Sequence, residues 1–476
     1  MTNVAIIGAG ITGLSSAYFI KQKYPHVNVT IYEATDRPGG KIKTVHHDGY
    51  TIELGPESYL GRKTIMTEVA KAVGMTDDDI VTNETGQSYI FANDTLYPIP
   101  GGAILGVPTD IKPFMSTKLI SMKGKLRALK DLTIKPIEME NEDMSVGEFF
   151  RTRLGDEVLE NLIEPLLSGI YGTDIDVLSL MSTFPNFKAL EEEHGSIIKG
   201  MQHVKKERQQ QAQHNQQGPQ AQHNQQGPQG QFKQFRHGLN DFVNKLEQWL
   251  KAHDVTFHYE TPVHDLIGTQ KGYYVELNDE SRSFYDGVIV ATPHQVFREW
   301  FSTDPMFDYF SKLEASSVAT VVFAFDEANI ENTSDGTGFV VARTSATDIT
   351  ACTWTTKKWP HTTPEGKVLI RAYIGKQGDN IVNEKTDEEL VAIAKNDLQQ
   401  MMTFHGEPDF TIVNKMPYAS PQYHVGHIAR IKAIQQHICD NYQHLQITGA
   451  PFEAVGLPDC IRQAETAVKQ LLSRIG

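Results

Sequence analysis

The chain has 476 residues, of which 39% are hydrophobic and 22% charged, and its formal net charge is −15. This length exceeds what one ordinary core holds, so we expect two or three domains. The acidic balance argues against a general nucleic-acid binder. The cysteines, Cys352, Cys439 and Cys460, lack zinc or redox-pair spacing. We therefore expect no metal site and a reducing, cytoplasmic setting.

Apolar runs along the chain are short. None reaches the roughly 18 residues that a membrane-spanning helix needs. The first run, at residues 4–7, leads directly into glycines and is too short for the core of a signal peptide. We therefore expect a protein without a membrane span or a secretory leader.

Strand and helix patterns alternate from the start of the chain. Residues 3–7 are an apolar run typical of a buried parallel strand, residues 14–21 are helix-like, and residues 27–32 alternate like a second strand. A helical pattern starts at 239, and a last helix is expected from about 459 to 474. Further strand-like runs lie at 255–259, 273–277, 287–291, 318–325, 367–374 and 445–448. The pattern predicts an α/β protein with an additional mixed sheet.

Two segments stand apart in composition. Between 119 and 132, lysines and an arginine interleave with leucines, which fits a core-packed helix with a solvated lysine face. Contact with a membrane surface or a hydrophobic substrate entrance is the other interpretation. Further on, the sequence QAQHNQQGP at 211–219 repeats without change at 220–228. This segment offers little to bury, so we predict a flexible loop.

A glycine-rich motif follows the first predicted strand and opens the first helix. Its residues are Gly8, Ala9, Gly10, Ile11, Thr12 and Gly13, and the acidic Glu33 ends the next strand. The first glycine permits a tight turn, Gly10 lets a pyrophosphate approach the backbone, and Gly13 lets helix and strand pack closely. The helix N-terminus favours the phosphates, and Glu33 can accept hydrogen bonds from ribose hydroxyls. This context predicts a dinucleotide site.

Three further features favour FAD over NAD. The run from Arg37 to Lys41 (RPGGK) adds a second glycine pair and cations close behind Glu33. Residues 289–293 form a strand that ends in a small-residue turn and can return to the first sheet. Near the C-terminus, a strand is followed by Gly449, a loop with Gly456 and a helix that starts near Asp459. A helix N-terminus there suits the reduced flavin, which carries negative charge.

These features, in this order, resemble the protoporphyrinogen/coproporphyrinogen oxidase family, whose fold is of the amine-oxidase type. The specific matches are Gly55–Ser58 (GPES), residues 164–171 (EPLLSGIY) and residues 455–461 (VGLPDCI). The resemblance covers nearly the whole chain and is strongest to the soluble Gram-positive branch, which forms coproporphyrin. It implies FAD as cofactor and a Rossmann-like FAD-binding domain with a mixed-sheet substrate domain and an inserted helical domain.

By this resemblance, the FAD domain is discontinuous. It is expected to comprise residues 1–48, 233–297 and 418–476, with a substrate domain at 49–90 and 298–417. The inserted helical domain is expected at 91–205, and the flexible glutamine-rich loop at 206–232. The implied reaction oxidises coproporphyrinogen III to coproporphyrin III in haem biosynthesis. Molecular oxygen reoxidises the flavin and becomes hydrogen peroxide.

The resemblance also assigns cofactor contacts beyond the glycine motif. Gly55, Pro56, Glu57 and Ser58 are expected at the isoalloxazine ring, and Val263 is expected to hydrogen-bond adenine through its backbone. The remaining expected cofactor contacts are Ala34, Gly40, Lys41, Gly449, Val455, Gly456 and Leu457. No residue stands out as a catalytic acid or base.

Coproporphyrinogen carries propionates, so its site needs cations. Arg62 and Lys63, just past the GPES run, are the leading candidates, although a solvated surface pair is an equal interpretation. Tyr171 is a candidate for stacking on the macrocycle, with a core tyrosine as its alternative. Arg371, on a predicted strand, is a weaker cationic candidate. A downstream haem-pathway enzyme and, at most, peripheral membrane contact are further expected partners.

Several alternatives stay open at this point. A protoporphyrinogen IX oxidase has the same motifs, and flavin amine oxidases and carotenoid-type desaturases share the cofactor architecture. An FAD-carrying interaction protein would be coloured but redox-inert. An NAD dehydrogenase would purify without colour.

Overall fold

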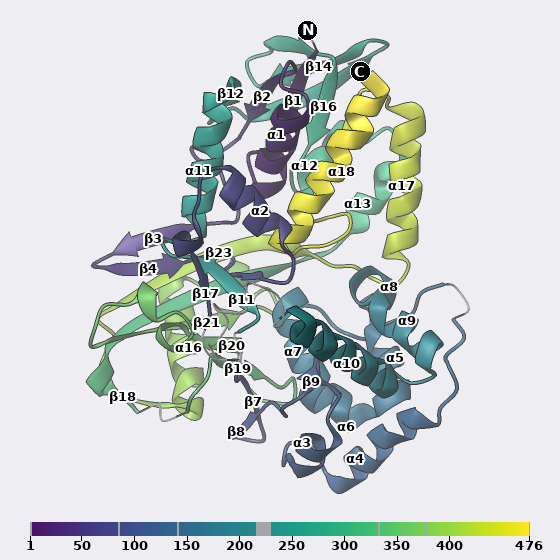
Figure 1. Cartoon of the computed structure of the whole chain (residues 1–476). Helices are drawn as coiled ribbons and strands as arrows, with labels where there is room; N and C mark the ends of the chain where they lie inside the picture. The colour runs from purple at the N-terminus through teal and green to yellow at the C-terminus, as the bar shows by residue number, and fades with distance from the viewer. Residues whose placement is uncertain are drawn as a thin grey trace. The chain divides into compact units, whose positions relative to one another are not determined.

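The computed structural model describes residues 2–83, 86–139, 142–215, 230–331, 334–376 and 378–475, without the side chains of 168–171, 208 and 211–215. Contacts divide the chain into two compact units, whose elements are labelled in Figure 1. Unit 1 comprises Met1–Thr82, Gln231–Glu314 and Ile428–Gly476. Unit 2 comprises Asn83–Gly230 and Ala315–His427.

Unit 1 is built on a parallel sheet in the order β12-β2-β1-β16-β24. Its strands are β1 (Asn3–Ile7), β2 (Asn28–Tyr32), β12 (Val255–His258), β16 (Gly287–Val290) and β24 (Leu445–Ile447). The strands are short and apolar because both faces of the sheet are covered. Segments far apart in sequence therefore end at one edge, which is where open α/β sheets bind ligands.

Helices cover both faces of this sheet. Val4 and Ile6 of β1 point into one core, while Ala5 and Ile7 point into the other. The first core contains α1 (Ile11–Lys23), α2 (Ile65–Ala72), α11 (Leu239–Ala252) and α18 (Leu457–Ile475). The second contains α12 (His294–Trp300), α13 (Asp308–Lys312) and α17 (His427–Asn441). Successive side chains of β1 point to opposite faces of the sheet, so the helices that pack against them form two layers, one on each face.

Three smaller sheets complete unit 1: the β3-β4 hairpin and the sheets β5-β11-β6 and β13-β14-β15. Their strands are β3 (Thr44–His47), β4 (Tyr50–Glu53), β5 (Tyr59–Leu60), β6 (Ile80–Thr82), β11 (Phe232–Phe235), β13 (Val263–Thr269), β14 (Gly272–Leu277) and β15 (Arg282–Tyr285). Because β11 pairs with both β5 and β6, the chain after the glutamine-rich segment returns to the residues that follow the GPES run.

Unit 2 contains a larger sheet in the order β23-β17-β21-β20-β19-β7-β8, antiparallel except for β19 and β7. Its strands are β7 (Tyr89–Ala92), β8 (Thr95–Pro98), β17 (Ala315–Asp326), β19 (Gly338–Val341), β20 (Ile349–Trp354), β21 (Lys367–Ile374) and β23 (Phe410–Pro421). Leu390, Ala394 and Leu398 of α16 (Asp387–Met401) pack on one face of it. Shorter elements are β9 (Ala103–Ile104), β10 (Val107–Pro108), β18 (Ile330–Glu331), β22 (Thr403–Phe404), α14 (Thr355–Lys358) and α15 (Ile381–Glu384).

The remaining described part of unit 2 is helical. Its helices are α3 (Ile111–Ser116), α4 (Met122–Leu129), α5 (Val146–Leu154), α6 (Asp156–Val158), α7 (Glu164–Tyr171), α8 (Leu180–Thr183), α9 (Pro185–His194) and α10 (Ile197–Asn215). Several are short, and Ser145 and Ser179 cap α5 and α8 through their hydroxyls. Such caps satisfy backbone N–H groups that a short helix leaves open.

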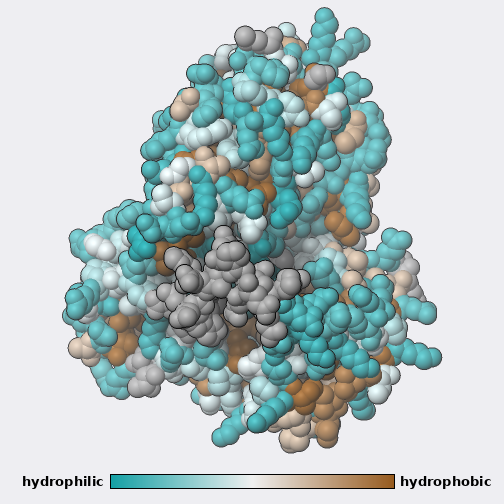
Figure 2. All heavy atoms as spheres, in the orientation of Figure 1, coloured by the Kyte–Doolittle hydropathy of each residue, from teal (hydrophilic) through white to brown (hydrophobic). Residues whose placement is uncertain are grey.

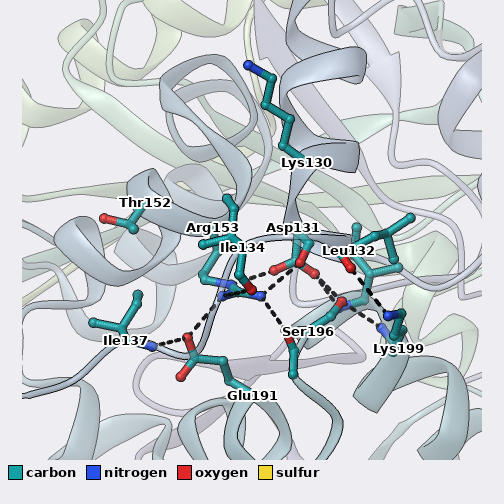
Figure 3. A network of polar contacts seen from close by, with 12 residues as sticks. Lys130, Asp131, Leu132, Ile134, Ile137, Thr152, Arg153, Glu191, Ser196 and Lys199 are labelled. Carbon is teal, nitrogen blue, oxygen red and sulfur yellow. Dashed lines mark hydrogen bonds and ion pairs between the residues drawn. The ribbon is translucent and has the colours of Figure 1, made fainter.

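A buried charge network joins these helices (Figure 3). Arg153 of α5 lies 2.5 Å from the carboxylate of Asp131 and 3.2 Å from that of Glu191, and all three side chains are 0% exposed. The guanidinium also donates to backbone carbonyls of residues 131, 134, 135 and 195, and Ser196 donates to Asp131. Each buried charge thus has a charged partner and hydrogen bonds, which buried charges require.

The α4 segment differs from the first sequence interpretation, a core-packed helix with a solvated lysine face. Met122 and Leu126 are 57% and 59% exposed, whereas Lys125 is buried and donates to the carbonyls of Met115 and Thr117. In Figure 2, hydrophobic residues gather at the lower edge, where Figure 1 shows α3 and α4. The prediction that this helix packs its apolar side chains on the core and exposes its lysines is therefore wrong. Within the described ranges, no helix is both long and apolar enough to cross a membrane.

The predicted α/β class with parallel and mixed sheets is confirmed. The loop predicted at 206–232 is partly wrong, because α10 continues to Asn215 and β11 begins at Phe232. Glutamine, lysine and glutamate are good helix formers, so a polar composition alone does not end a helix. Residues 216–229, with most of the repeat, lie outside the described residues. The finer division into three domains stays a prediction.

Candidate cofactor and ligand sites

The glycine motif of unit 1 forms the turn between β1 and α1. Gly8 has a φ of +100°, and its amide donates to the Tyr32 carbonyl at 2.8 Å. A Cβ atom on Gly13 would lie 1.9 Å from the Gly8 carbonyl oxygen, closer than any side chain can come. Glycine at both positions is therefore required by the fold, because it lets α1 start directly against the end of β1.

Gly10 is different, because no described residue fills the space beside it. A Cβ atom there would meet no described heavy atom within 4 Å. Gly10 is also the residue before α1, and neither a side-chain cap nor an acidic residue occupies the first turn. The helix N-terminus thus presents backbone N–H groups and positive potential toward an open space. A diphosphate fits this cradle in charge and in hydrogen-bonding type.

Glu33 stands beside the glycine motif, as the spacing predicts. Its carboxylate accepts hydrogen bonds from the Ala9 amide at 2.7 Å and from the Thr35 amide and hydroxyl at 2.9 and 2.8 Å. The side chain is only partly buried, so lone pairs remain for ribose hydroxyls. Ala34 next to it is exposed, and the Thr261 amide, two residues before Val263, donates to the Glu33 carbonyl. Val263 then opens β13.

The RPGGK run packs directly on the glycine motif. The Gly39 amide donates to the Ala9 carbonyl at 2.8 Å, and a Cβ atom on Gly40 would lie 3.3 Å from the Gly10 Cα. Arg37 donates to the carbonyls of residues 38, 40 and 42. Its guanidinium therefore organises the loop itself.

Lys41 is the cation of this run that faces outward. Its side chain is exposed, yet its pKa is lowered, chiefly by desolvation and against a smaller opposite effect of Cys460. Gly55 adjoins Lys41, since a Cβ atom on Gly55 would lie 1.9 Å from the Lys41 carbonyl oxygen. The GPES run, with Glu57 buried and Pro56 and Ser58 partly buried, thus starts beside Lys41.

The C-terminal segment reaches the same place. Gly449 follows β24 with a φ of +119°, and a Cβ atom on it would lie 3.6 Å from the Thr12 hydroxyl. Val455, Gly456 and Leu457 are partly buried where α18 begins. Burial raises the pKa of the Cys460 thiol to about 11, against smaller effects of Thr12 and Lys41. The start of α18 therefore adjoins both the glycine motif and the RPGGK run.

The predicted substrate residues fall into two places. Lys63 lies within 2.7 Å of both Asp459 oxygens at the start of α18, so its charge is already paired there, and Arg62 is exposed. Tyr171 ends α7 in unit 2, and its side chain lies outside the described residues. Arg371 is fully buried on β21. Lys63 is thus near the expected flavin edge, but the substrate role of all four residues stays a prediction.

A cavity in unit 2 was missed by sequence reasoning. It has a volume of about 420 Å³, and its lining includes Glu164, Arg343 and Lys376. These residues are distant in sequence and become neighbours only in the folded unit. The one available signal was Lys376, a lysine two residues after the apolar strand at 367–374, because binding residues are common in the loops that follow such strands.

Comparison with known proteins gives four matches. The family model for flavin containing amine oxidoreductases matches residues 11–472. Coproporphyrinogen III oxidase of Staphylococcus aureus (strain NCTC 8325 / PS 47) is 63% identical over 99% of both chains. The Bacillus subtilis (strain 168) protein of that name is 45% identical over 99% of this chain and 98% of its own. A solved structure from Exiguobacterium sp. 255-15, provisionally assigned as a protoporphyrinogen oxidase, superposes with a TM-score of 0.86 at 33% identity, covering 99% and 98% of the chains.

Proposed function

The chain belongs to the flavin containing amine oxidoreductase family, and on this premise we propose that it is an FAD-dependent oxidase that converts coproporphyrinogen III to coproporphyrin III in haem biosynthesis. The observation that carries the proposal is the 63% identity, over 99% of both chains, to a coproporphyrinogen III oxidase. Identity of this extent implies the same fold over the matched residues. The geometry of unit 1 agrees, because its glycine cradle accepts a diphosphate.

In this proposal, the backbone of unit 1 holds the cofactor. The amides after Gly10 bind the diphosphate, Glu33 accepts hydrogen bonds from the adenosine ribose, and Val263 meets the adenine. The GPES run and residues 455–457 border the isoalloxazine ring. Lys41, which adjoins Gly55, supplies a positive charge near the same ring. FAD held by these residues would supply the redox chemistry, as an acceptor of hydride from the substrate and a donor of electrons to molecular oxygen, with hydrogen peroxide as the product.

The protein's part in the reaction is to bind, orient and shield the substrate. The porphyrinogen loses hydrogen from its meso carbons and pyrrole nitrogens, and each round consumes one oxygen molecule. We assign no side chain as general acid or base. Alignment of the macrocycle beside the flavin, in a site that excludes water, is the catalytic contribution that this architecture supplies.

The proposal also includes partners and location. The substrate is a porphyrinogen, molecular oxygen is the electron acceptor, and a downstream haem-pathway enzyme receives the product. We place the enzyme in the cytoplasm, with membrane contact limited to the surface. Arg62, Lys63 and Tyr171 are proposed to contact the substrate.

A protoporphyrinogen oxidase is the second candidate, supported by the solved structure from Exiguobacterium. Mixing the purified yellow protein with each porphyrinogen under air, and following porphyrin fluorescence and hydrogen peroxide, tests both. We expect fast oxidation of coproporphyrinogen III and slower oxidation of protoporphyrinogen IX. Faster oxidation of protoporphyrinogen IX would reverse the assignment. A yellow protein that oxidises neither would be an FAD-carrying protein of another function, and turnover of amines would indicate an amine oxidase.

A further inference from the structure

The cavity in unit 2 has the size and lining of a ligand site. Its volume of about 420 Å³ falls in the range of small-molecule pockets. Val177, Val341 and Ile349 give it apolar walls, and polar groups stand at separate positions of its lining. An apolar wall with few polar groups suits an amphipathic ligand whose charged substituents project from an apolar body.

One cation of this lining is already neutralised. The Arg343 guanidinium lies 3.1 Å from the Glu164 carboxylate and 3.2 Å from that of Asp174. Two carboxylates thus share one guanidinium, and Arg343 has no spare charge for an anionic ligand. Its role is to make the buried Glu164 tolerable in this position.

Lys376 is the cation whose charge remains available. Its ammonium donates to the Thr347 carbonyl, a neutral group. Among the described residues, no carboxylate forms an ion pair with it. It is held at the cavity because Gly375, with a φ of +136°, lies so close to β17 that a Cβ atom would come within 2.3 Å of the Ser317 carbonyl oxygen. An ammonium that has no ion pair among the described residues, on a partly apolar wall, is a binding group for a carboxylate.

We propose that Lys376 binds one propionate of the tetrapyrrole and thereby selects coproporphyrinogen over protoporphyrinogen. The inference rests on the proposed function. Coproporphyrinogen carries a propionate on every pyrrole ring, whereas protoporphyrinogen carries neutral vinyl groups in place of the propionates on rings A and B. A cation aimed at one of those two rings distinguishes the substrates, because only one of them pairs with it.

The test compares Lys376→Met, which keeps length and removes charge, with Lys376→Arg, which keeps charge. Lys112→Met, an exposed lysine on α3, is the matched control. In the FAD-loaded full-length enzyme, we expect Lys376→Met to lower kcat/KM for coproporphyrinogen III by about ten-fold or more, mainly through KM. For protoporphyrinogen IX we expect a change below about two-fold. Lys376→Arg should retain most of the preference, and the control should match the wild type.

A second readout does not depend on turnover. Binding of the products, followed by porphyrin fluorescence, should show the Lys376→Met dissociation constant rising by about ten-fold or more for coproporphyrin III and little for protoporphyrin IX. An equal loss on both ligands would mean a structural role, and no loss on either would remove Lys376 from the site; both overturn the inference. If no variant, wild type included, oxidises either porphyrinogen, the proposed function fails, and product binding still decides for or against Lys376.

Discussion

The two units of this protein build binding sites from different materials. In unit 1, the cradle is made of backbone: the turn at Gly8, the open space at Gly10 and the helix that starts after it. In unit 2, the cavity and the buried network are made of side chains that meet across helices and strands, such as Glu164 with Arg343 and Arg153 with Asp131. Backbone sites leave a local signature in sequence, whereas side-chain sites depend on long-range contacts. The comparison predicts different responses to mutation.

The largest expected effect is in the buried network of unit 2. Arg153→Met should lower the free energy of unfolding by about 3–5 kcal/mol, because Asp131 and Glu191 would keep buried charges without their shared cation. Urea unfolding followed by circular dichroism measures this. Arg151→Met on the same helix is the control, since Arg151 is 40% exposed and pairs with exposed carboxylates; we expect at most about 1 kcal/mol there. Equal effects of the two substitutions would refute the structural role of the network.

The next effect separates two glycines of unit 1. Gly10→Val should leave the apo-protein as stable as the wild type, because the protein leaves that space open, but should weaken FAD binding by about a hundred-fold or more. Gly13→Ala should instead destabilise the apo-protein itself by about 1–3 kcal/mol, because its Cβ meets the Gly8 carbonyl with or without cofactor. Flavin absorbance and urea unfolding of both apo-proteins separate the two cases. A normally yellow Gly10→Val protein would contradict the cradle.

The pH dependence of stability should also differ between two carboxylates, because the pKa of Asp304 is lowered and the pKa of Glu164 is raised. Burial raises the pKa of Asp304 in unit 1, but hydrogen bonds from Tyr442, His437 and the Met306 amide outweigh it, and the net pKa is lowered. Its stabilising effect is therefore present above the ordinary value of about 3.9 and is lost as pH falls through the lowered pKa. Asp304→Asn should cost stability at neutral pH and progressively less below about pH 4.

Glu164 in unit 2 behaves in the opposite way. Burial raises its pKa, and Arg343 offsets only part of the rise. Its proton therefore stabilises the folded unit below the ordinary value of about 4.3, and this contribution is lost as pH rises through the raised pKa. Acidification toward about pH 4.5 should stabilise the wild type relative to Glu164→Gln, while the Asp304→Asn difference stays constant. Urea midpoints of the three proteins measured between about pH 7 and 3.5 give both slopes, and slopes of the same sign would contradict the assignment.

Much of unit 1 could be predicted because its determinants are local. The short apolar strand at 3–7, the glycine spacing and Glu33 lie within the first residues of the chain, and the structure places Glu33 within 2.7 Å of the motif. The role of Arg37 could not be predicted from the sequence. Its guanidinium donates to backbone carbonyls of its own loop. A cation near a phosphate motif has several possible hydrogen-bond partners, and only the folded loop shows which it takes.

In unit 2 two strands could be predicted, but the order of the strands in the sheet could not. The strands at 318–325 and 367–374 follow from β-branched runs, and both are present. The order β23-β17-β21-β20-β19-β7-β8 joins strands from opposite parts of the chain, which no local pattern encodes. Lys376 therefore could not be associated with Glu164 and Arg343 before the fold was known. Lys125 shows the same limit. It was expected in solvent, but its ammonium is buried and donates to two neighbouring backbone carbonyls.

The smallest expected effect concerns α4, where unit 2 exposes apolar side chains instead of burying them. The double substitution Met122→Glu and Leu126→Glu should change the free energy of unfolding by less than about 0.5 kcal/mol, because both side chains already face solvent. Exposed Lys118, Lys123 and Lys130 flank this pair, so we expect weak, salt-sensitive binding of the wild type to anionic lipid vesicles. The double variant should lose this binding and keep its oxidase activity on soluble substrate. Co-sedimentation with vesicles measures the lipid binding. Equal sedimentation of both proteins would show that Met122 and Leu126 do not contribute to it.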